Sequence, residues 1–154
     1  MTGLRKFSFV LALAVLFVAA VPAAHAEEKV FSPYEHITGS WQGATAIGST
    51  FLVSFEPAQS YTIFFSLPGV GSGHGHGAWE RTGLDTFALT DVSHILNPED
   101  GSVALVQKTQ VNVKVDGNAA DFELLVSLSL PDGTPVDTIW TVASAKRIVV
   151  EPIP

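Results

Sequence analysis

Apolar and polar residues alternate along most of the chain from residue 50 onward, with a repeat of two residues. The repeat is clearest in residues 102–115, where the apolar face carries Val103, Leu105, Val111, Val113 and Val115. Successive side chains of a β-strand point to opposite faces, so this repeat predicts strands with one buried and one solvated face. No helical stripe of apolar residues of useful length follows residue 26. The pattern therefore predicts an all-β domain.

Short turn sequences separate the alternating segments. Asp116-Gly117 is the strongest hairpin signal, and residues 97–101, Asn-Pro-Glu-Asp-Gly, form another turn signal. Residues 68–73 are rich in glycine, which disfavours a helix, so we expect a loop there and treat residues 68–77 as a candidate mouth loop. The predicted strands are residues 37–43, 51–56, 60–67, a strand through Trp79, 86–96, 102–115, 122–130 and 136–150.

The order of these strands predicts a closed barrel. Short links place each strand beside the previous one, which makes an antiparallel up-and-down meander of about eight strands over residues 37–151. Closing such a sheet removes both of its unpaired edges. The alternative is a β-sandwich, but Greek-key sandwiches use a long crossover link and the sequence offers none. An eight-stranded barrel either fills its interior with side chains or holds one small ligand.

The first 26 residues have the features of a secretory signal peptide. A basic start is followed by the apolar run 7–21 and by the small-residue sequence Ala24-His25-Ala26. The run is shorter than the roughly 20 apolar residues of a membrane span. We therefore expect cleavage after residue 26, an N-terminal arm at residues 27–36, a secreted or periplasmic product, and no membrane span after cleavage.

The expected mature chain is acidic. The whole sequence has 8 Lys and Arg against 15 Asp and Glu, and loss of Arg5 and Lys6 with the signal peptide leaves 6 against 15, a net charge near −9. An acidic chain without a basic cluster argues against nucleic acid as a partner. The chain contains no cysteine, so disulfides, thiol catalysis and zinc–thiolate sites are excluded.

Gly39-Ser40-Trp41, near the start of the first predicted strand, is similar to the Gly-x-Trp mark of lipocalins and other calycin barrels. In those barrels the tryptophan packs at the closed end, under an arginine of the last strand. The resemblance therefore implies a lipocalin-like barrel in which Arg147 stacks on Trp41, and a cation over an aromatic face is physically favourable. The expected structural pair is Trp41 and Arg147.

A second resemblance covers about residues 39–150. The sequence Gly-His-Gly-Ala-Trp-Glu-Arg-Thr-Gly at residues 75–83, the Val-rich strands and the terminal Arg147-Ile148 look like a family of small exported bacterial proteins described as lipocalin-like. Those proteins are mostly uncharacterised, so the resemblance implies a fold and a compartment but no reaction.

Histidines and carboxylates suggest two kinds of chemistry. His74 and His76 are two residues apart, and with Glu80 they share one face of a strand, so they are candidate ligands for a transition metal. The alternative is that these imidazoles only form hydrogen bonds beside flexible glycines, and we expect neither a metal nor a cofactor. The candidate acid–base residues are His76, Glu80, Asp91 and His94, with Asp91 and His94 on opposite faces of one strand.

The bulky apolar residues are candidates for a ligand pocket. The candidate binding residues are Phe65, Trp79, Phe87 and Trp140. We expect a barrel that binds a small apolar or amphipathic molecule in its lumen. The alternatives are a lumen-based isomerase or cyclase, similar to the allene-oxide-cyclase-like barrels, and a packed structural or interaction module without a ligand. Whether the protein is an enzyme stays open, with binding favoured over catalysis.

Overall fold

The computed structural model describes residues 36–149 and 151–153. The predicted signal peptide and the predicted arm up to residue 35 lie outside the described residues. Among the described residues, we find no helix that has the length and apolar character of a membrane span.

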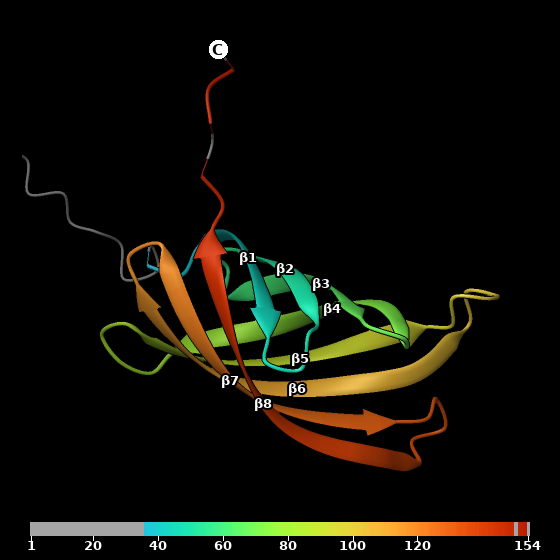
Figure 1. Cartoon of the computed structure of the whole chain (residues 1–154). Coiled ribbons are helices and arrows are strands. Elements are labelled where there is room, and N and C mark those ends of the chain that lie inside the picture. The colour runs from blue at the N-terminus through green and yellow to red at the C-terminus, as the bar shows by residue number, and fades with distance from the viewer. Residues whose placement is uncertain (1–35, 150, 154) are drawn as a thin grey trace, which may run out of the picture. The chain divides into compact units, whose positions relative to one another are not determined.

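Eight antiparallel strands form one closed barrel (Figure 1). The strands are β1 (Gly39–Thr45), β2 (Thr50–Phe55), β3 (Ser60–Leu67), β4 (Gly71–Arg81), β5 (Thr86–Leu96), β6 (Val103–Asp116), β7 (Ala119–Ser129) and β8 (Pro135–Arg147). Each strand pairs with the next one in the sequence, and β8 returns to pair with β1. The predicted all-β, up-and-down meander closed into a barrel is confirmed.

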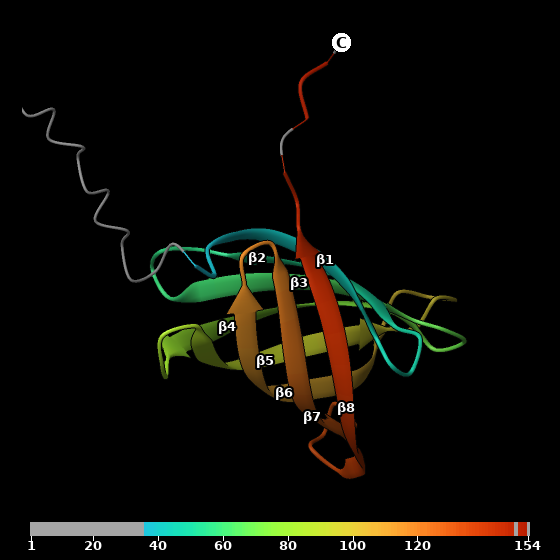
Figure 2. The same cartoon turned by 60° about the vertical axis from the view of Figure 1, so that its left-hand side comes forward.

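Strands of unequal length make the two ends of the barrel different. Strand β1 has 7 residues, whereas β8 has 13. Pairing between β1 and β8 covers only Ala143–Arg147 of β8, so residues 135–142 run past the end of β1 (Figure 2). Strand β8 meets only β7 over that stretch. Side chains there have fewer neighbours to bury them, and this end of the barrel is its open end.

Aromatic side chains fill the other end. Trp79 and Phe87 pack edge to face with their ring centroids 5.7 Å apart, and Phe55 lies against Tyr61 at 5.4 Å. The indole nitrogen of Trp79 also donates hydrogen bonds to the carbonyl oxygens of Glu56 and Ser60. Buried aromatic pairs of this kind contribute about 0.5–1.5 kcal/mol beyond the area that they bury. This packed end closes the barrel on the side of the β4–β5 turn.

Trp41 and Arg147 complete the closed end. They face each other across the β1–β8 pairing, and the guanidinium carbon of Arg147 lies 4.2 Å from the ring centroid of Trp41. This is the contact that the calycin resemblance implies. Trp41 is fully buried and donates its indole N–H to the carbonyl oxygen of Ile37 at 2.8 Å. Arg147 donates to the carbonyl oxygens of Thr38 and His36, so the pair fixes the chain that leads into β1.

The glycine-rich segment is a strand and not the expected mouth loop. Strand β4 begins at Gly71, and every residue from Gly71 to Ala78 pairs with β3. The three glycines at positions 73, 75 and 77 point into the barrel, where a Cβ atom would clash with Phe65, Ser93 and Tyr61 respectively. The expectation of a loop at residues 68–77 was wrong beyond residue 70, because these glycines make room for neighbouring side chains instead of making the chain flexible.

Candidate functional site

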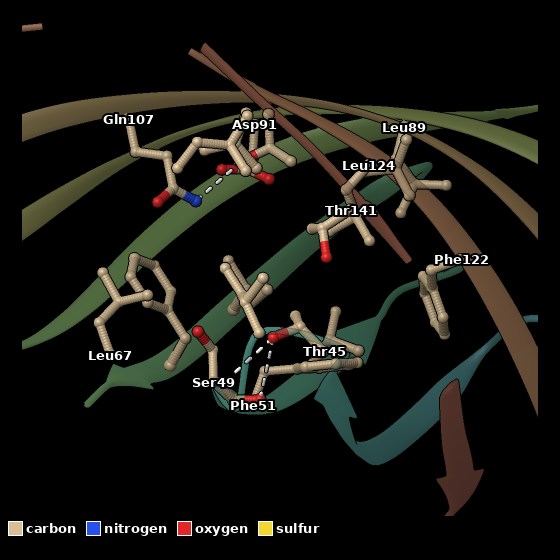
Figure 3. A pocket seen from close by; sticks show the side chains of 18 of the residues that line it. Thr45, Ser49, Phe51, Leu67, Leu89, Asp91, Gln107, Phe122, Leu124 and Thr141 are labelled. Carbon is tan, nitrogen blue, oxygen red and sulfur yellow. Dashed lines mark hydrogen bonds between the residues drawn. The ribbon is translucent and has the colours of Figure 1, made fainter. Parts of the chain in front are cut away.

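A cavity of about 100 Å³ lies inside the barrel (Figure 3). Its walls are mainly apolar, with contributions from Phe51, Val53, Ile63, Phe65, Leu67, Leu89, Val111, Phe122, Leu124, Val126, Leu128 and Ile139. Its polar lining consists of Thr45, Ser49, Tyr61, Asp91, Gln107, Thr109 and Thr141. An apolar chamber with a few polar groups at fixed positions is typical of small-molecule sites.

The cavity lies next to the open end of the barrel. Ile139 of β8 and Leu128 of β7 line the cavity but are only half-buried, and the same holds for Gln107 of β6. These three residues lie where β7 and β8 extend beyond β1. Ile47, in the link between β1 and β2, also lines the cavity and is 54% exposed, whereas lining residues deeper in the barrel, such as Tyr61 and Leu89, are buried. A ligand would therefore enter at this end, between the β1–β2 link and the exposed ends of β6, β7 and β8.

Asp91 is the centre of a buried hydrogen-bond network. The hydroxyl of Tyr61 donates to one carboxylate oxygen of Asp91 at 2.9 Å, and the hydroxyl of Ser93 donates to the other at 2.8 Å. The side chain of Thr109 also hydrogen-bonds to Asp91, and Thr109 receives a 2.9 Å hydrogen bond from the amide of Gln107. Inward side chains of three strands, β3, β5 and β6, thus converge on one carboxyl group. The inward glycines of the fourth strand, β4, leave the space for them.

Burial dominates the protonation of this network. Asp91 is 3% exposed, and its desolvation raises the pKa of the carboxyl group, although hydrogen bonds from Ser93, Tyr61 and Thr109 act in the opposite direction. Burial also raises the pKa of the Tyr61 phenol well above its usual value, and the nearby carboxylate of Asp91 adds to this. Both groups therefore hold their protons more tightly than they would in water.

Ser49 supplies a second polar group on the opposite side of the cavity (Figure 3). Its side-chain oxygen is buried and has no hydrogen-bond partner among the described residues. Its backbone is held in place because the Ser49 N–H donates to the hydroxyl oxygen of Thr45 at 3.0 Å. A buried hydroxyl without a partner costs about 1–3 kcal/mol, so an unused donor and acceptor at a cavity wall points to a ligand.

Of the four predicted binding residues, one lines the cavity. Phe65 contributes to its wall, whereas Trp79 and Phe87 are buried in the packed end. Trp140 faces outward on β8 and is 62% exposed. There it borders a shallow external depression together with Leu125 of β7. The two-residue repeat of β8 explains the placement, because Ile139 and Thr141 occupy the inward positions on either side of Trp140.

The predicted histidine and glutamate candidates all lie on the outside of the barrel. His74, His76 and Glu80 are exposed on one face of β4, as their spacing predicts, and that face is the solvent face. His94 is also outward and pairs directly with His74, whose ring stacks against Phe64 with 6.2 Å between the centroids. In the described part of the chain, no group of three or more His, Cys, Asp or Glu side chains has an arrangement that could hold a metal ion.

Asp91 is the one acid–base candidate that faces the cavity. Asp91 and His94 point to opposite faces of β5, as predicted from their spacing. Within the β4–β5 hairpin, His76 pairs with Val92 on the outer face, and Asp91 pairs with the inward Gly77. His76 and Asp91, two of the candidate acid–base residues, therefore lie on opposite faces of the sheet and do not form a pair.

Sequence reasoning did not single out Ser49, Tyr61, Ser93 or Thr109 as site residues. Ser93 and Tyr61 follow the inward alternation of their strands, which was a usable signal. No such sequence signal exists for Ser49, because this residue lies in the link between β1 and β2, where side chains do not alternate between two faces. Its inward orientation depends on the hydrogen bonds with Thr45.

Comparisons of the sequence with protein-family models and with curated proteins give no match. The fold described above therefore defines the class of protein: a closed, eight-stranded antiparallel barrel with an internal cavity. Membership of the calycin group and a bacterial origin stay predictions from the residues quoted above.

Proposed function

We propose that this protein is an exported, lipocalin-like barrel that binds a small apolar or amphipathic molecule in its lumen. The observation that carries the proposal is the cavity of about 100 Å³ with largely apolar walls and the buried hydroxyl of Ser49, which has no hydrogen-bond partner among the described residues. Apolar walls supply affinity through the removal of hydrocarbon from water. The few polar groups fix the orientation of the ligand.

The size of the cavity restricts the ligand. A protein cavity of about 150 Å³ is known to accept benzene, so about 100 Å³ suits a short alkyl chain or a single small ring. A retinoid or a long fatty acid would require the open end of the barrel to move apart. At that end, residues of β7 such as Leu128 and of β8 such as Ile139 are only half-buried.

Binding is favoured over catalysis by the placement of the candidate residues. A lumen-based isomerase would need at least an acid and a base beside the substrate. His76, Glu80 and His94 face solvent, which leaves Asp91 and the strongly proton-retaining Tyr61 in the cavity. The packed interaction module is disfavoured by the presence of a cavity with an unpartnered hydroxyl.

Export is part of the proposal and rests on residues 1–26 alone. A basic start, an apolar run and a small-residue cleavage sequence support it. Edman sequencing or intact mass of the protein recovered from its host tests this step. We expect the mature chain to begin at Glu27, and recovery of the full-length chain in the cell interior would contradict export.

Native mass spectrometry of residues 27–154, purified from the original host, tests ligand binding. We expect a bound small molecule that is lost on collisional activation. Val126→Trp places a large ring on the cavity wall and should abolish the bound mass, whereas Trp140→Ala on the outer face should retain it. Melting curves verify that both variants fold. A bound mass that survives Val126→Trp, or the bare chain mass in every preparation, would contradict lumen binding.

A further inference from the structure

The cavity contains a buried carboxyl group that has no cationic partner among the described residues. Asp91 is 3% exposed and lines the cavity. Among the described residues, no Lys, Arg or His side chain lines this cavity. The two inward-leaning arginines, Arg81 and Arg147, lie toward the packed end and donate to backbone carbonyl groups there. Buried carboxylates in proteins are normally paired with a cation or bound to a metal.

The hydrogen bonds around Asp91 favour its ionised form. Three hydroxyl groups, those of Tyr61, Ser93 and Thr109, direct hydrogen bonds to it. A carboxylate offers about four acceptor positions, so about one position stays available for a further donor. Figure 3 shows Asp91 at the cavity wall, across the chamber from Ser49. A donor that enters the cavity can therefore reach the carboxylate without displacing a protein group.

We propose that the ligand is a small primary amine that binds as its cation, with the ammonium group hydrogen-bonded to Asp91 and the hydrocarbon body against the apolar wall. This inference rests on the proposed lumen binding. The ammonium group supplies the positive charge that none of the described residues places in the cavity, and its N–H donors match an acceptor-only carboxylate. The apolar body replaces water along Leu89, Val111 and Leu124.

Carboxylic acids and neutral ligands are poorer matches. A carboxylate ligand would place a second negative charge beside Asp91, which is strongly unfavourable at low dielectric. An alcohol can donate one hydrogen bond but leaves the charge of Asp91 without a partner. A hydrogen bond to a charged group is stronger than one between two neutral groups, and the difference corresponds to roughly a tenfold preference for the amine over the alcohol.

Isothermal titration calorimetry of residues 27–154 with isosteric probes tests the inference. The probes are n-propylamine and n-butylamine, the matching alcohols 1-propanol and 1-butanol, and butyrate, at about pH 7.5, where an alkyl ammonium keeps its proton. We expect the amines to bind about tenfold more tightly than the alcohols and butyrate not to bind. Asp91→Asn should remove the preference for amines while the alcohols still bind.

Matched variants and a second measurement test whether the amine binds inside the cavity and beside Asp91. Val126→Trp should abolish binding of amine and alcohol alike, whereas His76→Ala, on the outer face of the neighbouring strand, should change neither. In the wild-type protein, the ¹³C resonance of the Asp91 carboxyl carbon should shift with n-butylamine and much less with 1-butanol, because only the amine pairs a positive charge with the carboxylate. This readout does not require the Asp91→Asn variant to fold.

Each outcome discriminates between the two proposals. Equal binding of amines and alcohols, or a preference that persists in Asp91→Asn, overturns the amine inference and leaves lumen binding in place. If no probe binds, the amine inference is also overturned, and the native mass spectrum of the protein from its host decides lumen binding separately. Amine binding that survives Val126→Trp would place the amine on the surface and overturn the inference as well.

Discussion

The side-chain oxygen of Ser93 lies 1.9 Å from the position that a Cβ atom on Gly75 would occupy. The two residues face each other across the β4–β5 pairing, and the absence of a side chain on Gly75 gives Ser93 the space from which it donates to Asp91. The alternating glycines and histidines of β4 are thereby explained. Glycine faces the crowded interior and histidine faces solvent, so the glycines, and not the histidines, shape the site.

Gly75→Ala should destabilise the protein by about 1–3 kcal/mol, because the added methyl group overpacks the interior against Ser93 and the carbonyl oxygen of Val92. Urea denaturation followed by tryptophan fluorescence measures the change. His76→Ala, one residue along on the outer face, is the matched control and should change the free energy of unfolding by less than about 0.5 kcal/mol. Comparable effects of the two substitutions would contradict this assignment.

Ser49→Ala should weaken ligand binding without lowering stability. The free energy of unfolding of the ligand-free protein should be unchanged or higher by up to about 1–3 kcal/mol, because the variant removes a buried hydroxyl that has no partner among the described residues. Thr45→Ala is the control: it deletes the acceptor of the Ser49 N–H and should cost about 1 kcal/mol. A loss of stability in Ser49→Ala as large as that in Thr45→Ala would show that the hydroxyl has a structural partner.

Asp91→Asn should raise the melting temperature of the ligand-free protein at pH 7. The pKa of Asp91 is raised by burial, so the folded state binds the proton more tightly than the unfolded state does. The contribution of this carboxyl group to the free energy of unfolding is complete at pH values below its pKa in the unfolded state, which is near 4. The contribution is lost as the pH rises through the pKa in the folded state. Asparagine removes that dependence, and Tyr61 and Ser93 can accept from its amide because hydroxyl groups both donate and accept.

The pH dependence provides the check on that prediction. Melting curves at several pH values should show the advantage of Asp91→Asn shrinking as the pH falls, and it should be smallest below about pH 4, where the wild-type carboxyl group is protonated in both states. If the difference in melting temperature stays constant with pH, hydrogen bonding, and not the burial of a charge, causes the higher stability of Asp91→Asn. A variant that is less stable at pH 7 would contradict the prediction outright.

Tyr61 should stay protonated at alkaline pH for as long as the barrel is folded. Burial, the charge of Asp91 and the hydrogen bond between the two groups raise the pKa of the phenol, so its contribution to stability is complete below about pH 10 and is lost above it. The difference in phenolate absorbance between the wild type and Tyr61→Phe should appear only together with loss of the folded circular-dichroism spectrum. Ionisation of Tyr61 in the folded protein near pH 10 would disprove this.

Arg147→Lys should destabilise the closed end by about 1–3 kcal/mol. Lysine keeps the charge but loses the planar stack on Trp41 and the paired donation to the carbonyl oxygens of Thr38 and His36. Thermal and urea unfolding measure the loss. Lys146→Arg, at the neighbouring outward position, is the control and should be neutral. Ligand affinity should not change, because neither residue lines the cavity.

The sequence by itself determined the architecture of the described domain. Alternation with a period of two residues and turn signals such as Asp116-Gly117 are local properties, and they specify strands and their order without knowledge of distant contacts. Closure follows because a meander of eight strands would otherwise leave two edges unpaired. The contact between Trp41 and Arg147 was implied by a resemblance at the two ends of the chain.

Only the tertiary structure decided which polar residues make the site. Alternation predicts that His74, His76 and Glu80 share a face of the strand, but it does not predict which face is inside. In the structure, the large side chains of Phe65 and Tyr61 occupy the space beside β4, so only glycine fits at the inward positions. The cluster of Tyr61, Ser93 and Thr109 around Asp91 joins three strands whose register sequence reasoning does not supply. The orphan hydroxyl of Ser49 depends on a link between strands, where side-chain direction is set by local hydrogen bonds and not by a repeating pattern.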